Sequence, residues 1–228
     1  MPLGEVSLAE PHNNVVILDY GAGNIYSMRN ALERVAGPHQ RVVVTRDPQR
    51  VAKADRIVLP GVGSYPSCMQ KLRNAQLLPA LEETVIVRQR PFLGICVGMQ
   101  ILSEVGEEFQ LTPGLGWIPG RVCKIATAKR LPHVGWTPLQ PRPECPLFAS
   151  LGSGARDVYF LHSFVFLPTD PKHVSAHASY GEALVAAVWR NNIYGCQFHP
   201  EKSGALGLRI LERFCQLDAT GVPNACAP

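Results

Sequence analysis

The stretch PFLGICVGMQIL, residues 91–102, joins two apolar runs through a cysteine that has a glycine two positions away on either side. A buried structural cysteine behaves as a small hydrophobic residue and needs no special backbone, so Gly94 and Gly98 suggest that the local geometry serves the sulfur atom. A strand must turn abruptly into a helix at Cys96, which is the arrangement called a nucleophile elbow. The stretch therefore predicts a strand, a sharp turn at Cys96 and a helix over residues 98–106.

The same alternation of apolar strand and amphipathic helix extends toward the N-terminus. The predicted strands are residues 14–20, 41–45, 56–60 and 91–95, and the helices that follow them are residues 24–37, residues 48–54, a segment through Met69 and Leu72, and residues 98–106. Continuous apolar strands that alternate with helices are typical of a parallel sheet covered on both faces. We therefore expect an α/β fold, with a flavodoxin-like, mostly parallel central sheet.

From about Gly120 the pattern changes to short strands separated by proline. These segments are residues 121–125, 133–139, 157–164, 173–180, 183–189 and 193–201. They predict antiparallel additions to the same sheet, and residues 203–217 predict a closing amphipathic helix. The expected organisation is a single domain over residues 14–218, between a flexible leader (1–13) and a flexible tail (219–228).

Composition excludes several classes of function. The chain has 228 residues and a net charge of +4, and its lysines and arginines are scattered, so it shows no basic stripe for nucleic acid and no membrane anchor. The most apolar window, residues 84–102, is interrupted by Arg88 and Arg90, which argues against a membrane span. Seven cysteines without a C-x-x-C pair fit free thiols in the cytoplasm.

Cys96 is a candidate nucleophile. The elbow would place its thiol at the carboxyl end of a parallel strand and at the N-terminus of a helix, where the dipole favours a thiolate and the Val97 amide can meet a developing oxyanion. The alternative is a buried cysteine at a strand end. That interpretation suits the six other cysteines, at positions 68, 123, 145, 196, 215 and 226.

A thiolate nucleophile needs a proton shuttle, and His199 is the strongest candidate among seven histidines because Pro200 and Glu201 follow it at a strand end. In extended chain, residues two apart face the same way at roughly 6.6 Å, so the Glu201 carboxylate could orient the imidazole. A surface turn is the alternative. No H-x-x-H or C-x-x-C spacing occurs, and GAGN (21–24) lacks the features of phosphate loops, so we expect no metal and no cofactor.

With these residues in place, the sequence resembles the class I, triad-type glutamine amidotransferases. The resemblance covers about residues 15–218. Its motifs are DYGAGN (19–24), LPGVGSY (59–65), GICVGMQ (94–100), LPHVGW (131–136), YFLHSF (159–164) and FHPEKS (198–203). DYGAGN and PHVGW favour a narrower similarity, to the glutaminase subunits of imidazole glycerol phosphate synthase in histidine biosynthesis.

The resemblance implies a mechanism. Cys96 would attack the side-chain amide of L-glutamine and form a glutamyl thioester, with His199 moving the protons and Glu201 holding His199. The positions that would bind the oxyanion or the substrate are Gly61, Val62, Gly63, Val97, Gln100, Ser163 and Phe164. Val97 stands where the family often has leucine, Thr137 where asparagine is common, and Phe164 where tyrosine is frequent. Phe164 lacks the phenol of tyrosine, so a side-chain hydrogen bond to the substrate is not expected there, whereas a backbone role is unaffected.

The resemblance also implies a partner. Ammonia would pass to a (β/α)₈-barrel cyclase subunit in a heterodimer, with no nucleic acid or membrane involved. Asn24, Trp136 and Tyr159 match positions near that interface, although an aromatic residue in a strand is more often part of a core. His133 could be a structural cap.

Two alternatives remain open on these grounds. The chain could be the glutaminase of another synthase, for anthranilate, guanylate, pyridoxal phosphate or carbamoyl phosphate, or a stand-alone γ-glutamyl hydrolase. It could also be a catalytically silent binding module with the same fold.

Overall fold

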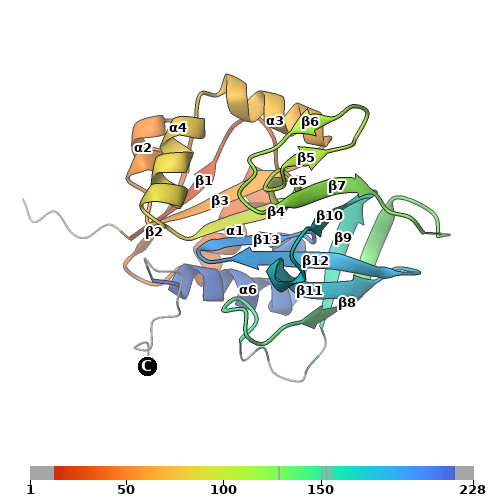
Figure 1. Ribbon diagram of the computed structural model, residues 1–228. Coiled ribbons are helices and arrows are strands. Elements are labelled where there is room, and N and C mark those ends of the chain that lie inside the picture. Colours follow the sequence, from red (N-terminus) through yellow and green to blue (C-terminus); the bar gives the residue numbers. More distant parts are fainter. Residues whose placement is uncertain (1–12, 128, 150, 152–153, 155, 219–228) are drawn as a thin grey trace, which may run out of the picture.

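The computed structural model describes residues 13–127, 129–149, 151, 154 and 156–218 (Figure 1). The expected flexible leader (1–13) and tail (219–228) lie outside these residues, except for Asn13, which begins the first strand. No helix in the described part of the chain is long and apolar enough to cross a membrane.

Within the described residues, the main sheet has nine strands in the order β2-β1-β3-β4-β13-β12-β11-β8-β9. In that order they are β2 (Gln40–Thr45), β1 (Asn13–Leu18), β3 (Arg56–Gly61), β4 (Phe92–Cys96), β13 (Ile193–Cys196), β12 (Ala183–Arg190), β11 (Val174–Ser179), β8 (His133–Pro141) and β9 (Asp157–His162). The first five are parallel and follow the 2-1-3-4-5 order of flavodoxin-like sheets. The remaining pairs are antiparallel. The expected α/β fold class is confirmed.

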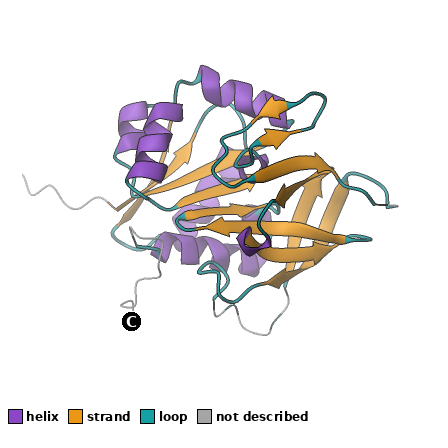
Figure 2. Ribbon diagram, viewed as in Figure 1, coloured by secondary structure: helices purple, strands orange, loops and turns teal. Residues whose placement is uncertain are grey.

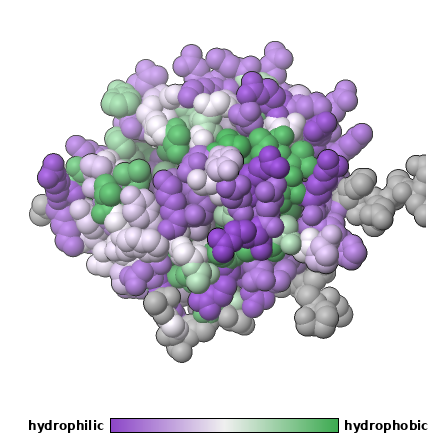
Figure 3. Space-filling model, turned by 180° about the vertical axis from the view of Figure 1, so that it is seen from behind, coloured by the Kyte–Doolittle hydropathy of each residue, from purple (hydrophilic) through white to green (hydrophobic). Residues whose placement is uncertain are grey.

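The helices cover both faces of this sheet (Figure 2). On one face α1 (Ile25–Val35) packs against α6 (Gly204–Gln216), and on the other α2 (Pro48–Ala52) packs against α4 (Leu78–Glu82), which continues as the π-helical turn η1 (Glu83–Val87). The other helical segments are α3 (Tyr65–Asn74), α5 (Val97–Gln100), η2 (Pro171–His173) and η3 (Pro200–Lys202). Every residue of β3 and β4 is buried between these layers. Figure 3 shows the reverse face, where apolar residues gather near the middle of a mainly polar surface.

Two expectations about the C-terminal half are wrong. A second sheet, in the order β10-β7-β5-β6, contains β7 (Gly120–Lys124) and β10 (Phe164–Pro168) together with the short strands β5 (Val105–Gly106) and β6 (Thr112–Pro113). The predicted strand over residues 157–164 bends at Ser163, so its two parts enter different sheets. In addition, β13 lies parallel to β4 inside the main sheet. All four of its residues are buried, as expected of a strand covered on both faces.

The helix expected over residues 98–106 is also wrong, because α5 ends at Gln100. The carbonyls that a longer helix would use are bonded to the following loop. Leu115 N donates to Ile101 O (2.8 Å), Ile118 N to Leu102 O (3.1 Å) and Gly116 N to Ser103 O (2.9 Å). The loop therefore replaces the helix as the hydrogen-bond partner of this segment.

Candidate active site

Cys96 lies at the carboxyl end of β4 and is only 5% exposed. Its backbone has φ 55° and ψ −114°, a strained conformation for a residue with a side chain. The flanking glycines allow the close packing of this turn. A Cβ on Gly94 would lie 2.4 Å from Gly98 O, and one on Gly98 would lie 2.0 Å from Leu59 O in β3. The glycines therefore let backbone pack directly on backbone, and the tight turn directs the thiol toward the sheet edge.

His199 and Glu201 meet beside this thiol. His199 follows β13, the strand next to β4, so both residues lie at the same edge of the parallel sheet. Because a carboxylate can only accept, His199 Nδ1 donates to Glu201 Oε1, at 2.9 Å, and both side chains are almost fully buried. The pair is formed by the 3₁₀ turn η3 and not by an extended segment.

The protonation of His199 depends on its two partners. Burial alone would lower the pKa of its imidazole. Its hydrogen bonds to Cys96 and Glu201, together with the negative charge that both partners can hold, outweigh burial and raise the pKa to about 10. The site therefore stabilises an imidazolium beside the sulfur atom.

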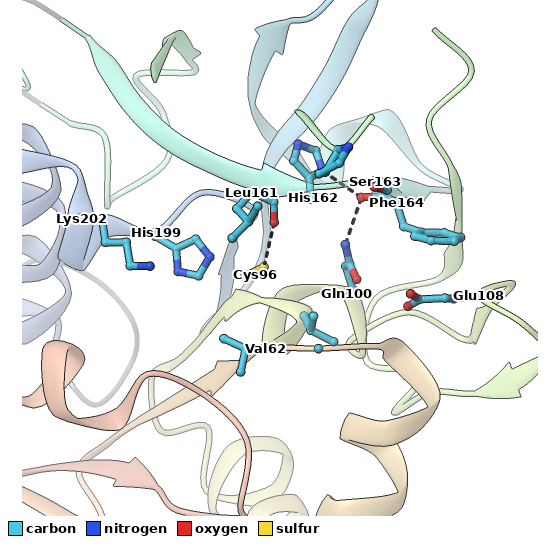
Figure 4. Close-up of a pocket in the computed structure, with 13 residues that line it drawn as sticks. Val62, Cys96, Gln100, Glu108, Leu161, His162, Ser163, Phe164, His199 and Lys202 are labelled. Carbon is cyan, nitrogen blue, oxygen red and sulfur yellow. Dashed lines mark hydrogen bonds between the residues drawn. The ribbon is translucent and has the colours of Figure 1, made fainter. Parts of the chain in front are cut away.

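One cavity of about 310 Å³ opens at this edge (Figure 4). Eight of its lining residues were predicted from the sequence: Val62, Gly63, Cys96, Val97, Gln100, Ser163, Phe164 and His199. Five were not: Glu108, Pro132, Leu161, His162 and Lys202. The structure thus brings together residues from the two sheets and from the loops after β3 and β5. Glu201 lies behind His199 and does not line the cavity.

The glycine loop after β3 faces the elbow. Gly61 pairs with Cys96 in the register of β3 and β4, and a Cβ on Gly61 would lie 2.4 Å from Gly98 N. Val62 is 42% exposed, and the Cys68 thiol donates to its carbonyl oxygen at 3.3 Å. Cys68, expected to be a structural cysteine, therefore also holds the loop. Since α5 has a single turn, the helix dipole expected to favour the thiolate is short.

Gln100 connects the elbow to the strand that follows β9. Its Nε2 donates to Phe164 O and to Gln197 Oε1, each at 3.0 Å. These bonds use both amide hydrogens, so only Gln100 Oε1 remains to bind a ligand, as an acceptor. Gln197 Nε2 in turn lies 3.8 Å from Cys96 Sγ. The Cys96 thiol lies 3.9 Å from Leu161 O.

Glu108 is a cavity residue that no sequence pattern indicated. It lies in the loop between β5 and β6, is half-buried, and its Oε2 accepts from the first amide of α3, Tyr65 N, at 2.7 Å. A single glutamate in a loop has no spacing signal. By contrast, His162 and Lys202 lie inside the quoted motifs YFLHSF and FHPEKS, so their place next to predicted residues could have indicated them.

The residues predicted at a partner interface lie in two places. Trp136 in β8 is 56% exposed and makes an edge-to-face contact with Tyr159 in β9, with ring centroids 6.0 Å apart. Val134 and Leu161 on the same two strands are also exposed. Asn24 instead caps α1, where its Oδ1 accepts from Ser27 N at 3.4 Å.

Comparisons with known proteins show what this chain is similar to. The family described as glutamine amidotransferase class-I matches residues 16–216. Proteins named imidazole glycerol phosphate synthase subunit HisH are similar. The one from Zymomonas mobilis is 45% identical over 89% of this chain and 95% of its own. The one from Rhodospirillum rubrum is 46% identical over 88% of this chain and 97% of its own length.

Solved structures share the fold. A structure described as PurLQS from Thermotoga maritima superposes with a TM-score of 0.64 at 19% identity, over 89% of this chain and 97% of that one. A structure described as a glutamine amidotransferase superposes with a TM-score of 0.67 at 20% identity, over 87% of this chain and 98% of that one.

Proposed function

Because the chain belongs to the glutamine amidotransferase class-I family, we propose that it is the glutaminase subunit of an imidazole glycerol phosphate synthase and releases ammonia from L-glutamine at Cys96. The observation that supports this most strongly is that Cys96 and His199 share the wall of one cavity while Glu201 holds His199 from behind. A thiol, an imidazole and an orienting carboxylate are what amide cleavage through a covalent intermediate requires.

The first half-reaction forms a thioester. The Cys96 proton moves to His199, and the sulfur attacks the side-chain amide carbon of glutamine. Backbone amides of Val97 and of the Gly61–Gly63 loop stabilise the negative oxygen of the tetrahedral intermediate. His199 then gives its proton to the amide nitrogen, the C–N bond breaks, and ammonia leaves.

The second half-reaction hydrolyses the thioester. His199, again neutral, takes a proton from water, and the resulting hydroxide attacks the glutamyl carbonyl. The C–S bond breaks, glutamate leaves, and the proton on His199 returns to the sulfur. Glu201 stabilises the imidazolium in both halves.

The cavity suits a small amino acid. About 310 Å³ is at the lower end of small-molecule sites. Glu108 offers a carboxylate to the α-ammonium group of glutamine, and Gln100 Oε1 offers an acceptor. The segment Ser163–Phe164 lines the same space.

The partner is proposed to be a (β/α)₈-barrel cyclase subunit that receives the ammonia within a heterodimer. The relatives are named as subunits of a synthase, and they match this chain over nearly their whole length, so the acceptor chemistry belongs to another chain. The proposed contact surface consists of the exposed apolar side chains of β8 and β9, Val134, Trp136 and Leu161, together with the half-buried Tyr159 that contacts Trp136. The free cysteines of the described residues suit a cytoplasmic enzyme.

Ammonia release from glutamine tests the proposal. Wild type and Cys96→Ala are compared, each with and without the cyclase and its nucleotide ligand, and Cys123→Ala serves as the control because Cys123 lies in β7 and does not line the cavity. We expect loss of activity only in Cys96→Ala. Equal release by wild type and Cys96→Ala would remove Cys96 as the nucleophile. We also expect the liganded cyclase to raise turnover, and an equal rate for the chain alone would refute that coupling.

A further inference from the structure

A second group of polar side chains begins at the cavity wall, which His162 lines, and has no part in the proposed chemistry. His133 and Thr137 come from β8 and His162 from β9, and all three are buried, with His133 1% and His162 6% exposed. His133 Nδ1 lies 3.1 Å from His162 Nε2, and His133 Nε2 lies 2.8 Å from Thr137 Oγ1. His133 is further enclosed by stacking on Phe160 and Tyr180.

The position of every proton in this group follows from one acceptor. His162 Nδ1 lies 2.9 Å from Phe164 O, and a carbonyl oxygen can only accept, so Nδ1 carries a proton. If His162 is neutral, its Nε2 accepts from His133 Nδ1–H. A neutral His133 then accepts at Nε2 from the Thr137 hydroxyl. Burial, which is the main cause in both cases, lowers the pKa of each histidine to about 4, so both are neutral near pH 7.

The Phe164 carbonyl joins this group to the active site. The same oxygen accepts from Gln100 Nε2, and the hydrogen bonds continue through Gln197 to Cys96. The preceding carbonyl, Ser163 O, is bonded to Ile125 N at 3.0 Å. The bend between β9 and β10 is therefore held at two successive carbonyls, one of them by the histidine pair.

We propose that His133 and His162 are positioning residues whose fixed Nδ1–H tautomers hold the Ser163–Phe164 segment in the conformation that binds the substrate. This inference rests on the proposed function, because that segment is taken as part of the glutamine site. Neither imidazole is assigned a role in proton transfer. A hydrogen bond of this kind contributes about 0.5–1.5 kcal/mol, so its loss should raise KM for glutamine about two- to tenfold, with a smaller effect on kcat.

The tautomers can be observed directly. Two-dimensional ¹H–¹⁵N NMR of the imidazoles in the full chain at pH 7, assigned with His133→Asn and His162→Asn, should show both residues neutral and protonated at Nδ1. An Nε2–H tautomer of His162, or an imidazolium at either position, would overturn the proposal. This measurement uses the wild-type fold and does not depend on activity.

Kinetics of the full synthase complex supply the second test. Asparagine at position 162 places its amide near Nδ1 of the original ring, whereas glutamine places its amide near Nε2. We expect His162→Asn to keep KM within about twofold of wild type and His162→Gln to raise it toward tenfold. Equal KM values for the two variants would contradict the positioning role. Failure of the proposed function would appear differently, as ammonia release that survives Cys96→Ala whatever the tautomer of His162.

Discussion

Replacing Gly98 by alanine tests the packing that creates the elbow. The added Cβ would lie 2.0 Å from Leu59 O, and ordinary contact begins at 3.4 Å, so a gap of 3.4 − 2.0 = 1.4 Å must open between α5 and β3. The three atoms nearest to the added Cβ are all backbone atoms of the buried strand β3 or its end, so no flexible side chain can move aside there. Overpacking against rigid backbone costs about 3 kcal/mol in free energy of unfolding. A displacement of about 1 Å at Cys96 lowers kcat/KM about 10²-fold.

Urea unfolding of the chain and glutaminase assays of the complex measure the two effects of Gly98→Ala. Gly37→Ala is the matched control, because the nearest atom to its added Cβ is 3.7 Å away and its φ is not in the left-handed region. The control should change the free energy of unfolding by less than about 1 kcal/mol. A Gly98→Ala protein that matches Gly37→Ala in both assays would refute the close packing of α5 on β3.

Three further results are expected. Glu201→Gln removes the negative charge behind His199, so the pKa of the His199 imidazole should fall below about 10 and kcat should fall about 10²-fold or more. NMR titration measures the pKa and ammonia release measures kcat. An unchanged kcat would contradict the orienting role of Glu201. The free energy of unfolding should decrease as the pH falls from about 6.5 to about 4, because the buried His133 and His162 bind protons more readily after unfolding. His162 alone should contribute about 3 kcal/mol to this decrease. A free energy from urea unfolding that is the same at both pH values would contradict the burial of neutral histidines. Asn24→Ala should lower the free energy of unfolding by about 1 kcal/mol through loss of the α1 cap, and Asn24→Ser should lower it much less. Equal losses for the two variants in thermal or urea unfolding would exclude a capping role.

The first four parallel strands could be predicted because each is a continuous apolar run followed by a helical pattern, whereas β13 could not be told from the antiparallel strands that precede it. The antiparallel half was less accessible, since pairing between short strands depends on contacts far apart in the sequence. Nothing in the sequence around Ser163 indicates that β9 and β10 enter different sheets. The predicted helix is too long because the apolar residues after Gln100 are not helical. Their carbonyls accept hydrogen bonds from the amides of residues 115, 116 and 118 instead.

The candidate site shows the same division. Cys96 and Gly98 are identified by their spacing. Glu201 is identified by its distance of two residues from His199, although a 3₁₀ turn and not an extended segment brings the two side chains together. Glu108 reaches the cavity from a loop, and its relation to the α3 N-terminus exists only in the folded chain. The hydrogen bonds of His162 likewise depend on the pairing of β8 with β9.

We propose that, among the cysteines that the structure describes, Cys96 is the one whose thiol is held for attack on a glutamine side chain. An electrophilic glutamine analogue, followed by peptide mapping of the modified protein, tests it directly. Modification of Cys96 at about one equivalent, prevented by excess L-glutamine and absent in Cys96→Ala, is the predicted result. Modification of a different cysteine, or no glutamine-protected modification at all, would contradict the account.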